Sequence, residues 1–285
     1  MHTLFADMFN REPNHIIDGD YYFGDAPSDS DEKFASGKFD GIANEWEEKR
    51  KKIYDRWPNG LPPFEVCDEI ATHIAQEGKP FMEIAVGCNL GLSPAILTKN
   101  PTIPCMLNDI HPAVVRACRH YIDRQLPESN ISLAGFDVVD IPMKDASFDY
   151  VISRYGLGSA WFRNEAGLKA VNEVYRMLKS GGVLVAMEYE WEHNEAAAEW
   201  VRLSEESPET ELTKFMRSSW ECMLYKKGLT WASVLEAAGF TVEQAESCGC
   251  FKTQKRNIGF GSEMQTIHLS SEQHLKRTLF IARKP

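Results

Sequence analysis

The chain has 285 residues, with 31 Lys and Arg against 42 Asp and Glu, which gives a formal net charge of −11 with His counted as neutral. Hydrophobic residues at 43% exclude a disordered chain, and the acidic excess argues against a nucleic-acid partner, because binding nucleic acid needs a surface rich in Lys and Arg. No apolar run approaches the roughly 20 residues of a membrane-spanning helix, the start lacks a signal-peptide pattern, and the seven scattered Cys suggest reduced thiols, so we expect a cytoplasmic protein with no membrane partner.

Residues 1–60 are predicted to form an N-terminal arm and a lid helix ahead of the core, residues 61–285. The arm contains an acidic run at 25–32, which has too little apolar surface to offset the entropy lost on ordering. We therefore expect an irregular arm that is mobile or held only by its aromatic neighbours. The apolar spacing at 42–54 predicts the lid helix.

From residue 61 onward, short apolar runs alternate with helical patterns, which predicts βαβ units and a parallel sheet. A helix opened by Pro62 and Pro63 stops at Gly78, and another begins with Ser93 as its N-cap. Residues 190–227 lack a strand signal and predict an inserted helical cap, and the loop with Gly259 and Gly261 is expected to be exposed. The predicted strands are 81–86, 103–108, 131–136, 148–153, 183–187, 240–245 and 275–282, and further helices start at Pro112 and cover 164–178 and 231–238.

A glycine-containing loop, with Gly87 and Gly91, connects the first of these strands to a helix. In open α/β sheets ligands bind beyond the carboxyl ends of the strands, and glycine lets the backbone approach them closely. Asp109 ends the next strand about twenty residues later, where a carboxylate accepts hydrogen bonds from ribose hydroxyls. The loop and the carboxylate together predict a nucleoside ligand.

The amino-acid sequence of the loop favours one nucleoside ligand over the other. A dinucleotide fold requires G-x-G-x-x-G for its pyrophosphate, and Gly87-Cys-Asn-Leu-Gly91 does not fit that pattern. Glu83 adds a carboxylate nearby, which disfavours a diphosphate and favours a sulfonium. S-adenosylmethionine is therefore preferred over NAD, and an NAD-dependent reductase is the disfavoured alternative.

This segment resembles the first motif of class I S-adenosylmethionine-dependent methyltransferases, E/D-x-G-x-G-x-G, with Ala85 at its first glycine and Asn89 at its third. Residues 147–153, 178–184, 235–240 and 279–282 are similar to later segments of the same family. The resemblance implies a Rossmann-like, doubly wound, mostly parallel sheet with an antiparallel last strand, here with an N-terminal arm and an inserted helical cap. It also implies S-adenosyl-L-methionine as cofactor.

The resemblance extends to individual cofactor-binding residues. Asp109 falls where the family's ribose-binding acid stands, and Asp137 falls where an acidic residue contacts the adenine amine. The complete predicted set is Glu83, Ala85, Gly87, Asn89, Gly91, Asp109, Ile110, Asp137, Val138, Ser153 and Arg154.

Methyl transfer is an in-line displacement that depends mainly on alignment and needs a general base only when the nucleophile carries a proton. The candidates for that role are His193, Glu188 and Tyr155. Each has an alternative role: His193 as a solvated histidine, Glu188 as a helix-capping or salt-bridging residue, and Tyr155 as a core residue.

Aromatic residues are the candidates for a lid or an acceptor pocket, because aromatic faces attract a sulfonium and stack on flat rings. They are Tyr21, Tyr22, Trp46 and Tyr189, and Trp200 and Trp220 in the cap share the same ambiguity. The alternative is that they anchor the arm to the core. Cys248 and Cys250 have no second pair at metal-ligand spacing, so no metal is expected.

The sequence thus predicts S-adenosylmethionine-dependent methyl transfer to an O-, N-, S- or C-nucleophile of a small molecule. One alternative is a protein or RNA acceptor. Another is a non-catalytic partner subunit that keeps the fold. A homodimer is left open.

Overall fold

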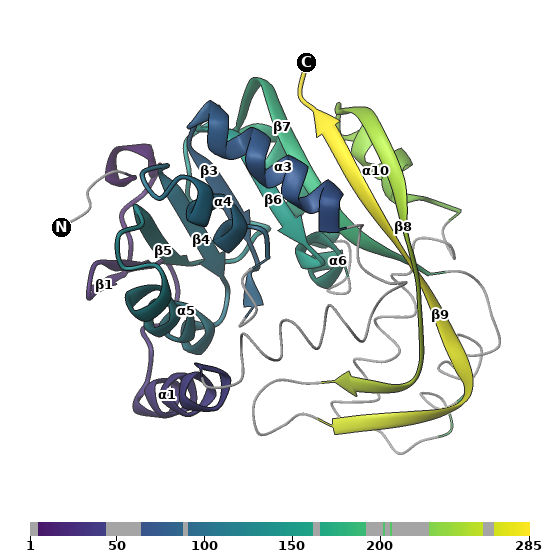
Figure 1. The fold of residues 1–285 in the computed structure, drawn as a ribbon, viewed down its shortest axis with the longest axis horizontal. Coiled ribbons are helices and arrows are strands. Elements are labelled where there is room, and N and C mark those ends of the chain that lie inside the picture. The colour runs from purple at the N-terminus through teal and green to yellow at the C-terminus, as the bar shows by residue number, and fades with distance from the viewer. Residues whose placement is uncertain are drawn as a thin grey trace.

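A computed structural model describes residues 5–43, 64–87, 91–161, 166–191, 228–258 and 265–285, with the single positions 202 and 206. These ranges form one mixed sheet in the order β1-β2-β5-β4-β3-β6-β7-β9-β8 (Figure 1). Pairing is parallel from β2 through β7 and antiparallel at β1, β9 and β8. The predicted fold class is confirmed for this part of the chain. The strands are β1 (His15–Ile17), β2 (Asp20–Tyr22), β3 (Phe81–Ile84), β4 (Cys105–Asp109), β5 (Ile131–Gly135), β6 (Phe148–Arg154), β7 (Leu178–Trp191), β8 (Thr241–Ile258) and β9 (Gln265–Arg283).

Helices cover both faces of the sheet and bury a separate apolar cluster on each. One cluster takes side chains from α3, α4 and α5, and the other from α7 and α10. Strand residues alternate between them, because successive side chains of a strand point to opposite faces: Val151 of β6 faces one cluster, and Tyr150 and Ile152 face the other. A register shift between Phe148 and Tyr150 turns Phe148 to the same face as Val151. The helices are η1 (Ala6–Met8), α1 (Asp29–Ala43), α3 (Phe64–Glu77), α4 (Ser93–Lys99), α5 (Pro112–Gln125), α6 (Gly156–Trp161), α7 (Ala166–Met177) and α10 (Trp231–Ala237). No helix in the described ranges is both long and apolar enough to span a bilayer.

The expectation of an irregular N-terminal arm is wrong, because this segment extends the sheet. β2 pairs in parallel with β5, with Tyr21 opposite Ala134 and Tyr22 opposite Gly135. The two tyrosines point to opposite faces and are both buried. Burial of these two rings offsets the entropy that the segment loses on ordering, which the acidic run has too little apolar surface to do alone. The lid role predicted for Tyr21 and Tyr22 is corrected accordingly: both rings lie in the core.

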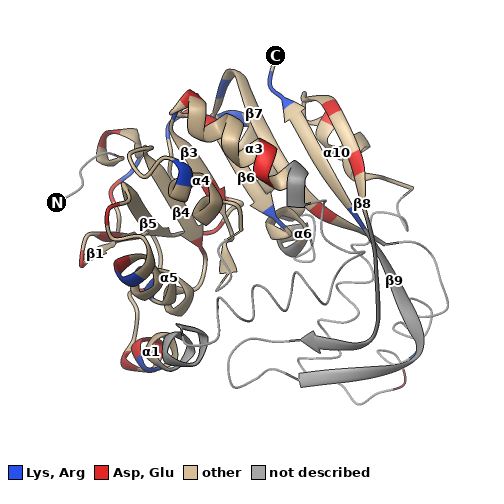
Figure 2. Cartoon of the chain, viewed as in Figure 1, with Lys and Arg blue, Asp and Glu red and all other residues tan. Residues whose placement is uncertain are grey.

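A buried carboxylate anchors this segment. Asp20 is fully buried in β2, and both of its oxygens accept hydrogen bonds from Nε of Arg119 on α5 at 3.2 Å. Arg116, one helical turn earlier, forms ion pairs with Asp18 at 3.0 Å and with Glu32 of α1. Charges of both signs therefore lie along α1, α5 and the turn before β2 (Figure 2). Burial raises the pKa of the Asp20 carboxyl, against the opposing effect of Arg119.

The C-terminal strands extend well beyond their predicted bounds. In place of strands at 240–245 and 275–282 with a loop between them, β8 and β9 pair as an antiparallel hairpin out to Ile258 and Gln265. The added residues, such as 252–257, are polar without an apolar alternation, so they carry no strand signal, although backbone pairing does not require one. Gly259, Gly261, the predicted helix from residue 44 onward and nearly all of the predicted cap lie outside the described residues.

Arg119→Ala tests the anchor. We expect the free energy of unfolding to fall by about 3 kcal/mol, the lower end for removing one partner of a buried ion pair, because Arg116 still lies 3.8 Å from Asp20. Chemical denaturation measures the change, with Arg124→Ala, on the exposed side of the same helix, as control. Equal stability of the two variants would show that the Asp20 ion pair does not hold the segment.

Candidate functional site

The candidate site lies at the carboxyl ends of the parallel strands. The strand order reverses between β3 and β6, and in doubly wound sheets ligands bind in the crevice at such a reversal. Three loops meet there, those after β3, β4 and β5.

A buried amide joins these three loops. Nδ2 of Asn108 donates to the carbonyl oxygens of Ala134, at 3.2 Å, and Phe136, at 2.9 Å, and its Oδ1 accepts from the backbone N–H of Ala85 at 3.3 Å. The side chain is fully buried at the end of β4. Sequence reasoning missed Asn108, whose only signal was its place beside Asp109.

Asp109 binds the glycine loop directly. Its Oδ2 accepts from the N–H of Gly87 and its Oδ1 from the N–H of His111, both at 3.0 Å. The backbone N–H of Ile110 also hydrogen-bonds to this carboxylate. A carboxylate has about four acceptor positions, so one remains for a ligand hydroxyl. Burial raises the pKa of Asp109, and these hydrogen bonds lower it. The structure thus brings together the loop and the acid that the sequence singled out.

The loop backbone explains the glycine pattern. Gly87 has φ +58° and Ala85 has φ +48°, both in the left-handed region. Gly87 adopts this conformation without a Cβ clash, whereas Ala85, where the resembled family has glycine, costs roughly 1 kcal/mol or more. Asn89 lies outside the described residues.

Glu83 holds the start of α4. Its two carboxylate oxygens accept from the N–H groups of Leu92 and Ser93, at 3.0 and 2.9 Å, and from the Ser93 hydroxyl. The prediction that Ser93 is the N-cap of this helix is therefore wrong. Its hydroxyl binds Glu83, and Leu92 takes the cap position without a side-chain hydrogen bond. A Cβ on Gly91 would lie 1.9 Å from Oε1 of Glu83, so the close approach of loop and carboxylate requires glycine there.

A cavity of about 240 Å³ opens at the loops after β4 and β5. Ile110, directly after Asp109, lies in its wall, and so does Asp137, whose Oδ1 accepts from the N–H of Val139 at 3.1 Å. Val138 is different, because its side chain is buried in the core. The full lining is Arg11, Phe23, Gly24, Asp25, Ile110, Pro112, Gly135, Phe136, Asp137 and Asp140.

Glu188 caps a helix and is not a base exposed to the site. Its Oε1 accepts from the Ser153 hydroxyl at 2.9 Å and the N–H of Leu157 at 3.2 Å, and its Oε2 from the N–H of Gly158 at 3.0 Å. Glu188 and Ser153 are both buried, and a Cβ on Gly158 would lie 2.8 Å from Oε2. Of the predicted alternatives, the structure shows the helix-capping one, at the start of α6. Burial raises the pKa of Glu188 to about 8.

Tyr155 and Tyr189 stack at the ends of β6 and β7, with ring centroids 4.1 Å apart and planes 8° apart. The Tyr155 hydroxyl donates to Sδ of Met187 at 3.3 Å. Burial raises the pKa of Tyr155 well above its usual value. Tyr155 therefore stays protonated and does not act as a base near neutral pH. Arg154 lies beside the glycine loop, with its Cβ 3.4 Å from where a Gly91 Cβ would stand. His193, Trp46, Trp200 and Trp220 lie outside the described residues.

Residues 84–186 match the family described as Methyltransferase domain. This range contains the glycine loop, Asp109, Asp137 and the strands β4 to β6. This match is consistent with the class I S-adenosylmethionine-dependent methyltransferases that the first motif resembles. Members of the family use S-adenosylmethionine as methyl donor.

Individual proteins are similar to part of this chain. A ubiquinone/menaquinone biosynthesis C-methyltransferase of Methylococcus capsulatus is 35% identical over 91 residues, 32% of this chain and 35% of that protein. A carboxy-S-adenosyl-L-methionine synthase of Photorhabdus laumondii is 29% identical over 106 residues, 36% of this chain and 40% of that protein. The chain thus aligns with well under half the length of these relatives. A solved S-adenosylmethionine-dependent methyltransferase of Methanosarcina mazei shares the fold, with a TM-score of 0.50 at 15% identity, over 75% of this chain and 96% of that one.

Asn108→Asp tests the amide of the methyltransferase domain. The substitution keeps the shape but sets a carboxylate oxygen against two carbonyl oxygens, and we expect it to lower the free energy of unfolding by about 2 to 3 kcal/mol. Urea denaturation measures the loss, and Asn172→Asp on the exposed side of α7 is the matched control. A loss no larger than that of the control would mean that Asn108 does not join the loops.

The raised pKa of Glu188 predicts a pH-dependent stability difference. With a pKa of about 8 in the fold and 4.5 unfolded, the folded chain binds the proton more tightly. The stability that Glu188 contributes is therefore complete below pH 4.5 and is lost as pH rises toward 8, on the order of 5 kcal/mol at about 1.36 kcal/mol per unit. Glu188→Gln cannot titrate. The stability advantage of the native chain over this variant should shrink between pH 5 and 8, as measured by denaturant titrations, and parallel curves would show that Glu188 does not titrate in this window.

Proposed function

We propose that the chain transfers a methyl group from S-adenosylmethionine to a small-molecule acceptor. The observation that carries the proposal is the Asp109 carboxylate, which binds the glycine loop through Gly87, retains an acceptor position and directly precedes Ile110 in the cavity wall. Ribose presents hydroxyl donors, one of which this position can accept.

The residues present fit the nucleoside part of the donor. Asp109 would bind the ribose, Ile110 would contact the base, and the Asp137 carboxylate in the cavity wall would accept from the adenine amine. The cavity is smaller than the roughly 300 to 1,000 Å³ of sites that enclose a whole drug-sized ligand, which supports its role as a subsite for one ring system.

Alignment accounts for the catalysis that these residues support. When bound, S-adenosylmethionine supplies a methyl group on a positively charged sulfur. Holding donor and acceptor in line contributes roughly 7 to 11 kcal/mol. Neither Glu188, which is buried on helix N–H groups, nor Tyr155, which stays protonated, supplies a base. His193 remains the candidate for acceptors that must lose a proton.

A small molecule is the proposed acceptor, because the net charge of −11 opposes RNA. A protein acceptor and a non-catalytic partner subunit are the rivals. Transfer of labelled methyl groups into the ultrafiltrate of a cell extract supports the small molecule, and labelling of protein supports the rival. A homodimer and a cytoplasmic location stay predictions.

Thermal unfolding with S-adenosylmethionine, S-adenosylhomocysteine and NAD tests donor binding. A ligand at a hundred times its dissociation constant stabilises the fold by about 2.7 kcal/mol, which raises the melting temperature by several degrees. We expect this shift with the first two ligands and not with NAD.

In Asp109→Ala the shift should vanish, while Asp68→Ala, which removes an exposed carboxylate on α3, should keep it. Circular dichroism of the ligand-free variants shows whether each is folded, and Asp109→Asn replaces Asp109→Ala if the latter is not. A full shift in a folded Asp109 variant would remove this residue from ribose binding. The absence of a shift in the native chain would favour the non-catalytic alternative.

A further inference from the structure

The N-terminal segment supplies a wall of the nucleoside cavity. Arg11, Phe23, Gly24 and Asp25 line it opposite the residues that follow β4 and β5. No part of the motif resemblance pointed to these four residues, which lie outside the range matched by the methyltransferase family.

Phe23 is held at the cavity by the sheet itself. Its N–H donates to the carbonyl oxygen of Gly135 at 2.8 Å, which continues the pairing of β2 with β5 by one residue. Its ring lies 6.2 Å from that of Phe136 and 4.9 Å from that of Phe9, between ring centroids. The ring is half-buried, so part of it remains open toward the cavity.

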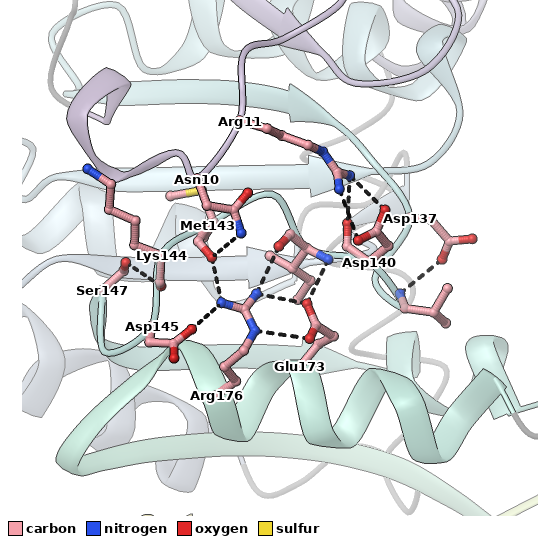
Figure 3. A network of polar contacts seen from close by, with 12 residues as sticks. Asn10, Arg11, Asp137, Asp140, Met143, Lys144, Asp145, Ser147, Glu173 and Arg176 are labelled. Carbon is pink, nitrogen blue, oxygen red and sulfur yellow. Dashed lines mark hydrogen bonds and ion pairs between the residues drawn. The ribbon is translucent and has the colours of Figure 1, made fainter.

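Arg11 connects this wall to the turn that carries Asp137. Its guanidinium donates to Oδ1 of Asp140 at 3.0 Å and to the Asp140 carbonyl at 3.2 Å, and lies 2.8 Å from Oδ2. The N–H of Asp140 in turn donates to the carbonyl of Asp137 at 3.0 Å. The Arg11 guanidinium carbon also lies 5.9 Å from the centre of the Phe23 ring. Figure 3 shows Arg11 reaching over Asp140 toward Asp137.

The far side of the same loop is held independently. Arg176 of α7 donates to the carbonyls of Met143, at 2.6 Å, and Ile141, at 2.9 Å, and Glu173 accepts from the N–H of Ile141 at 2.9 Å (Figure 3). Asn10 adds a hydrogen bond to the Met143 carbonyl at 3.1 Å. Loss of Arg11 therefore leaves the loop anchored, and its effect stays local to the cavity.

The charges of the wall also suit a nucleoside. Arg11 is paired with Asp140, and that pairing holds the pKa of the Asp140 carboxyl below its usual range. The two other carboxylates at the cavity, Asp25 and Asp137, favour a ligand that presents N–H donors and disfavour a phosphate.

We propose that Phe23 packs against the base of the bound nucleoside and that Arg11 is a positioning residue, which sets the distance between the Phe23 wall and the Asp137 turn. This inference rests on the proposed function, since it names which residues outside the family motifs determine affinity for the donor. The N-terminal segment is then part of the binding site and also an edge of the sheet.

Calorimetric affinities of the full chain for S-adenosylhomocysteine and for 5′-methylthioadenosine test the wall. Both ligands contain the nucleoside, and only the first carries the amino-acid part. Stacking of a base on an aromatic ring is worth about 1 to 3 kcal/mol, so Phe23→Ala should weaken both affinities by the same factor, roughly tenfold or more. Ile16→Ala, which removes an exposed apolar side chain of β1 in the same segment, should change neither.

Unchanged affinities in Phe23→Ala, or a loss confined to S-adenosylhomocysteine, would overturn the proposal. If the native chain binds neither ligand, the proposed function fails as well. If the native chain binds both and Phe23→Ala binds them equally well, only this inference fails. Melting of the ligand-free variant shows whether it folds, and Phe23→Leu, which keeps an apolar side chain but no aromatic face, replaces it if it does not.

Arg11 is tested by a double-mutant cycle. Arg11→Ala and Asp140→Ala should each weaken binding of 5′-methylthioadenosine about threefold. The double variant should lose no more than Arg11→Ala alone, because the ion pair that Asp140→Ala removes is already absent there. A merely structural role would lower the melting temperature of the ligand-free chain without this non-additivity. Fully additive losses, or none, would overturn the positioning role.

Discussion

The amide of Asn108 holds together the three strand ends on which the site depends. It pairs with a backbone N–H of the glycine loop on one side and, on the other, with the carbonyls of Ala134 in β5 and Phe136 just after it. A buried amide can meet these groups only if β3, β4 and β5 end at matching heights, since each unmade hydrogen bond costs about 1 to 3 kcal/mol. The same geometry places Asp109, the next residue, under the N–H of Gly87. Sheet register and ligand site are therefore settled by one set of hydrogen bonds.

The N-terminal segment shows how a charged stretch becomes part of a core. Asp20 would be costly to bury alone, but the Arg119 guanidinium meets both of its oxygens, and Tyr21 and Tyr22 bury their rings on the two faces of the sheet. Once β2 lies against β5, the chain that follows must pass the end of β5. Phe23 consequently stands beside the cavity, so the interaction that completes the sheet also completes the wall.

Local patterns predicted the elements whose signals are local. The strands β3 to β6 appear in the sequence as apolar runs, and the placement of Gly87 and Asp109 at one site follows from two motifs at a known spacing. The hydrogen bonds of Arg11 with Asp140 join residues 129 positions apart, and the register of Tyr22 with Gly135 is equally non-local, so neither leaves a pattern in the sequence. The polar halves of β8 and β9 were missed because their strand pairing is a property of the backbone. For Glu188 the sequence left the capping and pocket roles open, because only the position of α6 decides which groups its oxygens meet.

The two strand-end glutamates, Glu83 on β3 and Glu188 on β7, perform the same structural task on either side of the crevice. Each accepts N–H groups at the start of a helix, α4 for Glu83 and α6 for Glu188, and each has a glycine, Gly91 or Gly158, where a side chain would collide with the carboxylate. Both carboxylates are therefore committed to shaping the backbone. In a reaction whose demand is alignment more than proton transfer, this use of the carboxylates fits the chemistry: buried acids hold the loops rigid, and binding is left to Asp109, Asp137 and the wall that the N-terminal segment provides.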